Sequence, residues 1–292
     1  MRLLIILLLI SFFACKKDTD LLNSKQFEFG NPQEVELIGY NDHIMEPFIS
    51  RDGELLFFNN LNKQHVNTDL HFAKRINDSV FQYEGLVKGA NSEFLDGVPS
   101  MDGSNNMYFV STRSYEQTLS TLYSGLFSSD TVTGIHLVKG ISKNLPGWVN
   151  FDIEVSEDGN VIYTVDGRFD ENGGPYESDL LMAVRKYNLF ERSDDMTLEL
   201  INTEAMEYAA CISSDMLELY FTRLTLPLSQ SSLPQIFVAT RTSDNEAFRK
   251  PYRVKEISGF AEAPTISPDS KIIYYHKNEN EVHKLYMIKK RD

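Results

Sequence analysis

Five carboxylic acids recur at matching places along this chain of 292 residues. Each lies a few residues before a short element that reads Ser-x-Asp, so the acids would gather wherever those elements converge. Gathered carboxylates raise one another's pKa or attract a cation. A ring of oxygen ligands suits a hard ion such as Ca²⁺, the one cofactor we consider. The five acids are Glu46, Asp96, Asp152, Glu207 and Glu262.

Three arginines accompany the acids, each just after an apolar run: Arg113, Arg168 and Arg223. Beside carboxylates, arginines form salt bridges or clamp an anionic or sugar ligand. Two long loops, 167–177 and 224–234, are expected on the same face. The alternative is that the acids bond backbone amides of neighbouring segments and hold no ligand. We take the eight side chains as the candidate ligand-binding site.

Motifs of the common catalytic sites are absent from the sequence. There is no Gly-x-Ser-x-Gly, no His-Glu-x-x-His, no phosphate loop and no Cys/His metal spacing. The six histidines are scattered, and we expect them to be structural or surface groups. This pattern favours a non-enzymatic protein with no catalytic residue. The alternative is a glycan-active hydrolase or lyase, which needs two carboxylates roughly 5–10 Å apart, with Glu46, Asp152 or Glu207 as candidates.

The elements that would position these side chains recur five times. Each unit has a short apolar segment, the Ser-x-Asp element, and a second run rich in Tyr, Phe and Ile. The aspartate of such a turn caps its own backbone, and a following glycine takes a positive φ, so each unit predicts a hairpin of two strands. The units begin their turns at Ser50, Ser100, Ser156, Ser213 and Ser267.

Further apolar runs predict a third and a fourth strand in most units, the fourth strand of the third unit being at 198–201. Four antiparallel strands in ~40–50 residues make a propeller blade. The last unit lacks a fourth strand, whereas residues near 34–39 form a spare one. We therefore predict an all-β, five-bladed β-propeller, closed by an N-terminal strand that joins the last blade. Its channel mouth would carry the acids.

The repeated pattern Pro-x-x-Ser-x-Asp-Gly, complete from Pro47 to Gly53, resembles the WD40-like (PD40, TolB-type) propeller repeats. The resemblance covers nearly the whole mature chain. The glycine is replaced in the fourth and fifth copies by Met216 and Ser270. Members of this family serve as scaffolds, partner-binding modules and occasionally enzymes, so the resemblance implies a fold more sharply than a function.

The N-terminus predicts secretion and lipidation. Residues 1–15 combine Arg2, an apolar run and a small residue before Cys15, as in a signal peptide that ends in a lipobox, with Phe12 where Leu is usual. The alternative is an ordinary signal peptide with an incidental cysteine. Residues 16–28 would be a flexible tether and 29–292 a single propeller. The start after the cut resembles lipoproteins of the Bacteroidetes.

The composition limits the partners. A formal net charge of −14 argues against binding to nucleic acid, because phosphates would be repelled. We therefore expect a monomeric lipoprotein of the bacterial outer membrane, facing the periplasm or the cell surface. Its propeller would bind an envelope protein or a glycan.

Overall fold

The computed structural model describes residues 26–62, 67–171, 173–193, 196–229 and 232–291. The expected signal peptide, Cys15 and most of the expected tether lie outside these residues. Within the described part of the chain, no helix has the length and apolar character needed to span a membrane.

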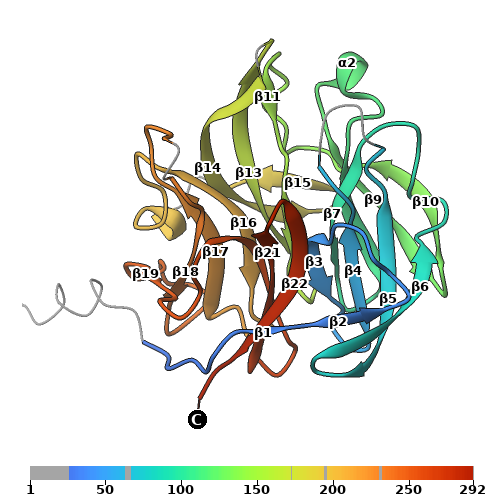
Figure 1. The fold of residues 1–292 in the computed structure, drawn as a ribbon. Helices are drawn as coiled ribbons and strands as arrows, with labels where there is room; N and C mark the ends of the chain where they lie inside the picture. Colours follow the sequence, from blue (N-terminus) through green and yellow to red (C-terminus); the bar gives the residue numbers. More distant parts are fainter. Residues whose placement is uncertain (1–25, 63–66, 172, 194–195, 230–231, 292) are drawn as a thin grey trace, which may run out of the picture.

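Five small antiparallel sheets stand in a ring, which confirms the five-bladed β-propeller (Figure 1). We number the sheets blades 1 to 5 in chain order. Blade 1 contains β3 (Met45–Ile49), β4 (Leu55–Asn59), β5 (Leu70–Asn77) and β6 (Val80–Leu86), and blade 2 contains β7 (Asp96–Met101), β8 (Asn106–Ser111), β9 (Leu122–Ser128) and β10 (Thr131–Leu137). Blade 3 contains β11 (Trp148–Val149), β12 (Ile153–Val155), β13 (Val161–Asp170), β14 (Gly173–Lys186) and β15 (Leu189–Arg192). Blade 4 contains β16 (Met206–Ile212), β17 (Glu218–Leu224), β18 (Gln235–Thr240) and β19 (Tyr252–Arg253), and blade 5 contains β20 (Phe260–Ile266), β21 (Ile272–Glu279) and β22 (Val282–Lys289).

The fourth strand of blade 3 differs from the prediction. Residues 198–201 do not form it; β15 does, and a short 3₁₀ helix, η1 (Met196–Leu198), comes afterwards. The chain reverses directly after β14 because Tyr187 takes a φ of 59°, so Phe190 rather than Leu198 enters the blade. One other helical turn, α2 (Tyr115–Thr118), lies in the loop between β8 and β9.

The N-terminal segment closes the ring, but it serves two blades rather than one. Strand β1 (Gln33–Glu34) pairs antiparallel with β22, and Phe29 bridges to Lys290, which confirms that an N-terminal strand joins the last blade. Residues 36–38 were also expected there. Instead β2 (Glu36–Ile38) runs parallel to β6 on the outer edge of blade 1 (Figure 1).

The physical reason for this split is that buried and exposed side chains alternate along residues 34–38. Val35 and Leu37 are buried in a cluster that contains residues of both blades, among them Phe81 and Met287. Because both side chains are buried between blades 5 and 1, the segment passes from the edge of blade 5 to the edge of blade 1. Similar apolar clusters lie between all neighbouring blades in the described residues, so the five repeats pack as one unit.

The turns between the first two strands follow the predicted chemistry in four blades. In each, the serine hydroxyl donates to the aspartate two residues later, as Ser50 does to Asp52 at 2.5 Å. The residue after the aspartate takes a positive φ even where it is Met216 (63°) or Ser270 (58°).

Blade 2 departs from this register. Its turn starts at Asp102, whose carbonyl accepts from the Asn105 amide at 3.2 Å, and Asn105 takes the positive φ of 64°. The predicted turn residue Ser100 is used elsewhere, because its hydroxyl donates to Glu154 at 2.8 Å in the channel. The turn is therefore two residues later than the repeat predicts, which changes the position of Asp96.

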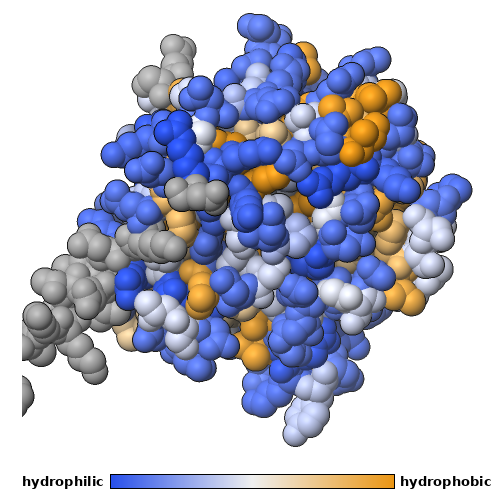
Figure 2. Space-filling view, turned by 90° about the horizontal axis from the view of Figure 1, so that it is seen from below, coloured by the Kyte–Doolittle hydropathy of each residue, from blue (hydrophilic) through white to orange (hydrophobic). Residues whose placement is uncertain are grey.

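The face that carries these turns is shown in Figure 2. It is mostly hydrophilic, and its hydrophobic residues form separate small groups. The opposite face carries the loops between second and third strands and the tip of the β13–β14 hairpin (Figure 1). We call it the mouth face, because the first strands begin there.

Candidate functional site at the channel mouth

Counting four residues back from each turn gives one inward-facing position per blade. These positions are Glu46, Val98, Asp152, Ala209 and Ala263, all of which line one central pocket. Four of them have a φ between 47° and 52°, a left-handed conformation that is uncommon for residues other than glycine. Only two of the five predicted acids thus occupy the inward position, because valine and alanine fill the others.

The pocket is narrow and closed at its lower end. Its volume is about 20 Å³, little more than the ~10–15 Å³ that one water requires. Below it, Arg51 of blade 1 reaches Glu154 of blade 3, with Nη2 and Oε1 2.9 Å apart and 9% and 4% of the two side chains exposed. Glu154 also accepts from Ser100 and from the Ile212 amide, so this ion pair links four blades across the channel.

Asp152 lies buried at the wall of this pocket, with 6% of its surface exposed. Its Oδ1 accepts from the Ile153 amide at 2.8 Å, whereas Oδ2 has no hydrogen-bond partner in the described residues. Burial, reinforced by Glu46, raises the pKa of Asp152 well above its usual range, although the amides of Ile153 and Ala209 oppose the shift. A buried carboxyl with a spare oxygen is costly unless something pairs with it.

Glu46 faces the same pocket and is half-buried. Among the described residues its carboxyl accepts one long hydrogen bond, with 3.5 Å from Asn62 Nδ2 to Oε1. Burial raises the pKa of Glu46 to about 7, with Glu262 adding to the shift and His276 opposing it. Both inward acids therefore favour the neutral form more than an exposed carboxyl does, and an approaching cation favours their charged form.

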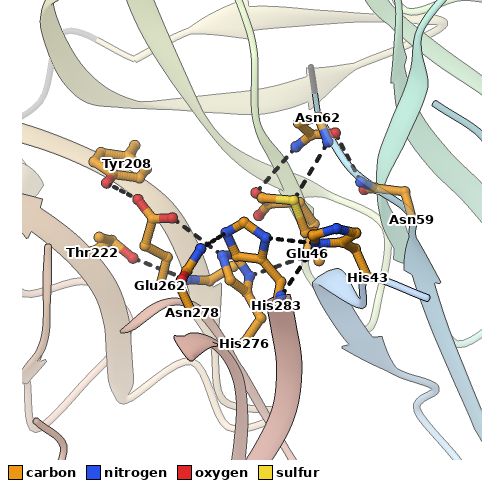
Figure 3. A network of polar contacts seen from close by, with 12 residues as sticks. His43, Glu46, Asn59, Asn62, Tyr208, Thr222, Glu262, His276, Asn278 and His283 are labelled. Atoms are coloured by element: carbon orange, nitrogen blue, oxygen red, sulfur yellow. Dashed lines mark hydrogen bonds and ion pairs between the residues drawn. The ribbon is translucent and has the colours of Figure 1, made fainter. Parts of the chain in front are cut away.

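Glu262 is held beside the pocket by a polar network (Figure 3). It accepts from the Tyr208 hydroxyl, and its Oε2 lies 3.2 Å from His276 Nε2. The other ring nitrogen of His276 accepts from the Glu46 amide at 3.2 Å. Burial disfavours the charged ring, but the hydrogen bond to Glu262 and the nearby acids outweigh it and raise the pKa of His276.

Asp96 and Glu207 belong to a different arrangement. Both are fully buried, and each pairs with an arginine of its own blade, Arg113 and Arg223 respectively. Each also caps a loop, Asp96 by accepting from Ser92 and Glu207 by accepting from Thr203. Since all their contacts hold the blade together, the structure does not bring these four residues into the central pocket.

Arg168 does not share the place of the other two arginines. It lies on the extended β13–β14 hairpin, 3.8 Å from Glu177, with 62% of its side chain exposed. The residues expected as a loop, 167–177, are therefore mostly strand. The hairpin tip and the segment after β17 enclose a second pocket of about 500 Å³ on the mouth face, lined by Pro175, Tyr176, Glu204, Leu226, Pro227 and Leu228.

Two features of the site were missed by the sequence reasoning. His276, expected to be a structural or surface group, is completely buried and bonds both Glu262 and the Glu46 backbone. The signal was present, because His276 lies opposite Glu262 in the β20–β21 register. The Arg51–Glu154 pair had no such signal, since its partners come from different blades.

A calcium ring is not formed by the predicted acids. Within the described residues there is no group of three or more His, Cys, Asp or Glu side chains arranged to hold a metal ion. The acids are divided among three places. Glu46 and Asp152 face the pocket, Glu262 lies beside it, and Asp96 and Glu207 pair with arginines.

Replacing Glu46 by glutamine should remove part of the pH dependence of stability. An unfolded glutamate titrates near ~4.3, whereas the folded pKa is about 7. A raised carboxyl pKa means that the wild type loses stability as pH rises through this interval. We expect Glu46→Gln to be more stable than the wild type by about 1–3 kcal/mol at pH 8 and nearly equal to it at pH 4.

Urea unfolding at pH 4, 6 and 8 measures this difference. The exposed Glu54→Gln is the matched control and should follow the wild type at each pH. Parallel curves for the wild type and Glu46→Gln would show that Glu46 titrates normally.

Comparison with known proteins gives similarity in fold. No protein-family model matches the chain, and no curated protein does. Among solved structures, an α-L-arabinofuranosidase from Podospora anserina in complex with cellotriose is 12% identical with a TM-score of 0.58, covering 94% of this chain and 99% of that one. An endo-arabinase from Bacteroides thetaiotaomicron is 13% identical with a TM-score of 0.56, covering 89% and 98%.

TolB from Acinetobacter baumannii is also similar, at 12% identity and a TM-score of 0.49. The alignment covers 86% of this chain and 55% of that one, so this chain spans about half the length of that TolB. Identities this low indicate a shared fold and leave activity open. The likeness to the arabinofuranosidase and the endo-arabinase is one of fold, in agreement with the five sheets of this chain.

Proposed function

We propose that the protein is a non-enzymatic lipoprotein of the cell envelope whose propeller binds a partner protein at the mouth face. The observation that carries the proposal is the shape of the central pocket. At about 20 Å³ it is closed below by the Arg51–Glu154 pair and is far too small for a sugar ring. It can receive the tip of a side chain from a partner lying across the mouth.

The second pocket on the mouth face supports a protein partner over a glycan. Tyr176 and Leu228 are 47% and 57% exposed at its wall, beside Pro175, Leu226 and Pro227. Exposed aromatic and aliphatic side chains in a pocket of this size are typical anchors of protein interfaces. The net charge of −14 adds a preference for a basic partner.

The membrane anchor is part of the same proposal. Cys15 would carry the lipid, and the polar residues after it would let the propeller reach its partner from the outer membrane. Cys15→Ser should abolish labelling by a palmitate analogue, whereas Cys211→Ser should leave it unchanged because Cys211 is buried in the propeller. Equal labelling of the Cys15→Ser protein would refute the anchor.

Site-specific photo-crosslinking in cells tests the binding face. A photoreactive residue in place of Tyr176 or Leu228 should give a discrete adduct with one partner. The matched control is Tyr187, which is 94% exposed but lies in the β14–β15 turn at the opposite end of the same blade. The proposal fails if Tyr187 captures the same partner equally, or if neither mouth-face position captures any.

A glycan-active hydrolase is the second candidate, favoured by one observation. Glu46, with its pKa of about 7, and Asp152 share a pocket, as an acid and a second carboxyl do in glycosidases. This candidate predicts turnover on a polysaccharide panel that Glu46→Gln abolishes. The narrowness of the pocket is the reason we rank it second, and activity that survives in Glu46→Gln would exclude this pair of acids.

A further inference from the structure

The central pocket has one chemical property that its geometry leaves unsatisfied. It contains two carboxyl groups, and both ring nitrogens of the neighbouring His276 are already used, one by Glu262 and the other by the Glu46 amide. Arg51, from below, is committed to Glu154 and to the carbonyls of Met101 and Val155. Among the described residues, Oδ2 of Asp152 is buried and makes no hydrogen bond of ordinary geometry, although the Ala209 amide is near enough to oppose the rise in the pKa of the carboxyl. The pocket therefore lacks a donor, and a cationic donor would suit it best.

The size of the pocket selects among cationic donors. About 20 Å³ accommodates a group the size of a water molecule. A primary ammonium has that size and offers three hydrogens. A guanidinium is a larger planar fork with five hydrogens, and a divalent ion needs more oxygen ligands than the described acids bring together.

The apolar part of the pocket wall suits the last methylene of an aliphatic stem, the rest of which lies outside so small a pocket. Val98, Pro99, Ala209, Ala263 and Pro264 line it between the acids. Long cationic side chains pack their methylene groups against such apolar surfaces while the charged end reaches a polar group. Glu46 lies at the start of β3, the end of the strand that meets the mouth face, where the proposed partner would lie.

We propose that the central pocket binds the primary ammonium group of a lysine side chain presented by the partner protein, with Glu46 and Asp152 as its acceptors. This rests on the proposed function and names the chemistry by which the mouth face recognises its partner. The ammonium donates to Oδ2 of Asp152 and to the Glu46 carboxylate, and the end of its stem contacts the apolar residues of the pocket wall.

The expected pH dependence follows from the groups that face these acids. Glu262, Tyr208 and His276 surround Glu46 on one side, and Asp152 and the Arg51–Glu154 pair lie on the other. Because burial raises the pKa of both inward acids, that of Glu46 to about 7, binding a cation near neutral pH displaces a proton from Glu46. Affinity should therefore rise severalfold from pH 6 to pH 8, and the heat of binding should depend on the ionisation enthalpy of the buffer.

Isothermal titration with small probes tests the assignment on the wild-type protein. Nα-acetyl-lysine amide should bind, whereas Nα-acetyl-norleucine amide, which lacks only the amine, and Nα-acetyl-arginine amide should bind at least ~10-fold more weakly. Equal binding of the norleucine probe, or no heat with the lysine probe at tens of millimolar, would overturn the proposal. Cadaverine forms a separate arm, and if it binds much more tightly than the lysine probe the ligand is a free diamine.

Substitutions of the two acids test whether the lysine probe binds in the central pocket. Asp152→Asn and Glu46→Gln should each weaken the lysine probe at least ~10-fold, and Glu54→Gln should leave its affinity unchanged. If Asp152→Asn does not fold, Glu46→Gln and the comparison of probes still decide. If the wild type binds the lysine and norleucine probes equally while crosslinks from Tyr176 and Leu228 still form, this inference is refuted and the protein-binding function stands. Loss of the crosslinks alone would refute the protein-binding function, and only the preference of the pocket for an ammonium group would remain.

Discussion

Arg51→Met should reduce the free energy of unfolding by about 3–5 kcal/mol, the usual cost of removing one partner from a buried ion pair. Glu154 would remain buried and uncompensated, and the carbonyls of Met101 and Val155 would lose their donor. Glu154 also accepts hydrogen bonds from Ser100 of blade 2 and the Ile212 amide of blade 4, so the substitution weakens contacts among four blades. Chemical denaturation followed by circular dichroism measures the loss.

Two variants serve as controls for Arg51→Met. Arg168→Met removes a pair whose side chains are 62% and 54% exposed, and it should cost less than about 1 kcal/mol. Arg51→Met combined with Glu154→Leu removes both charges and should recover at least half of the loss, because no unpaired charge stays buried. The role assigned to the pair is wrong if Arg51→Met and Arg168→Met cost the same.

Phe29→Ala should have a comparable effect, about 3–5 kcal/mol, the usual cost of truncating a buried phenylalanine. Phe29 is 2% exposed and packs in the cluster between blades 4 and 5, next to its bridge with Lys290. Its removal weakens the closure that holds β1 against β22, so the last blade should also exchange its amide hydrogens faster. Denaturation and hydrogen exchange of β22 together measure the effect.

The control for the closure is Phe94→Ala, because Phe94 is 44% exposed. It should cost less than about 1 kcal/mol and leave exchange in β22 unchanged. Uniformly faster exchange over all five blades in Phe29→Ala would mean that the ring unfolds as a whole. Unchanged exchange in β22 would mean that β1 does not secure it.

Much of the fold could be predicted because its signals are local. Alternating apolar residues and turn residues such as Asp52 and Gly53 act over a few positions, and their repetition revealed five blades. The offset in blade 2 shows the limit of this reasoning. The sequence Ser100 to Gly103 resembles the other turns, yet the chain turns two residues later. The Ser100 hydroxyl donates to Glu154 in the channel and does not take part in the turn.

The candidate site depended on that offset and on contacts between blades. Asp96 and Asp152 look equivalent along the sequence, but Asp96 pairs with Arg113 and Asp152 faces the pocket. The offset of two residues in the turn of blade 2 decides which of them faces the pocket, and the repeat pattern does not encode that offset.

The sequence by itself determined that the chain carries five repeated hairpin units, a spare N-terminal strand and an acid near each turn, because spacing and turn chemistry are properties of the chain. Tertiary structure alone decided which acids converge. Closing the ring brings Arg51 and Glu154, from blades 1 and 3, together across the channel and leaves Glu46 and Asp152 above them. The reason is physical: burial and pairing act between segments far apart in sequence, and the free energy of a buried carboxyl depends on those neighbours.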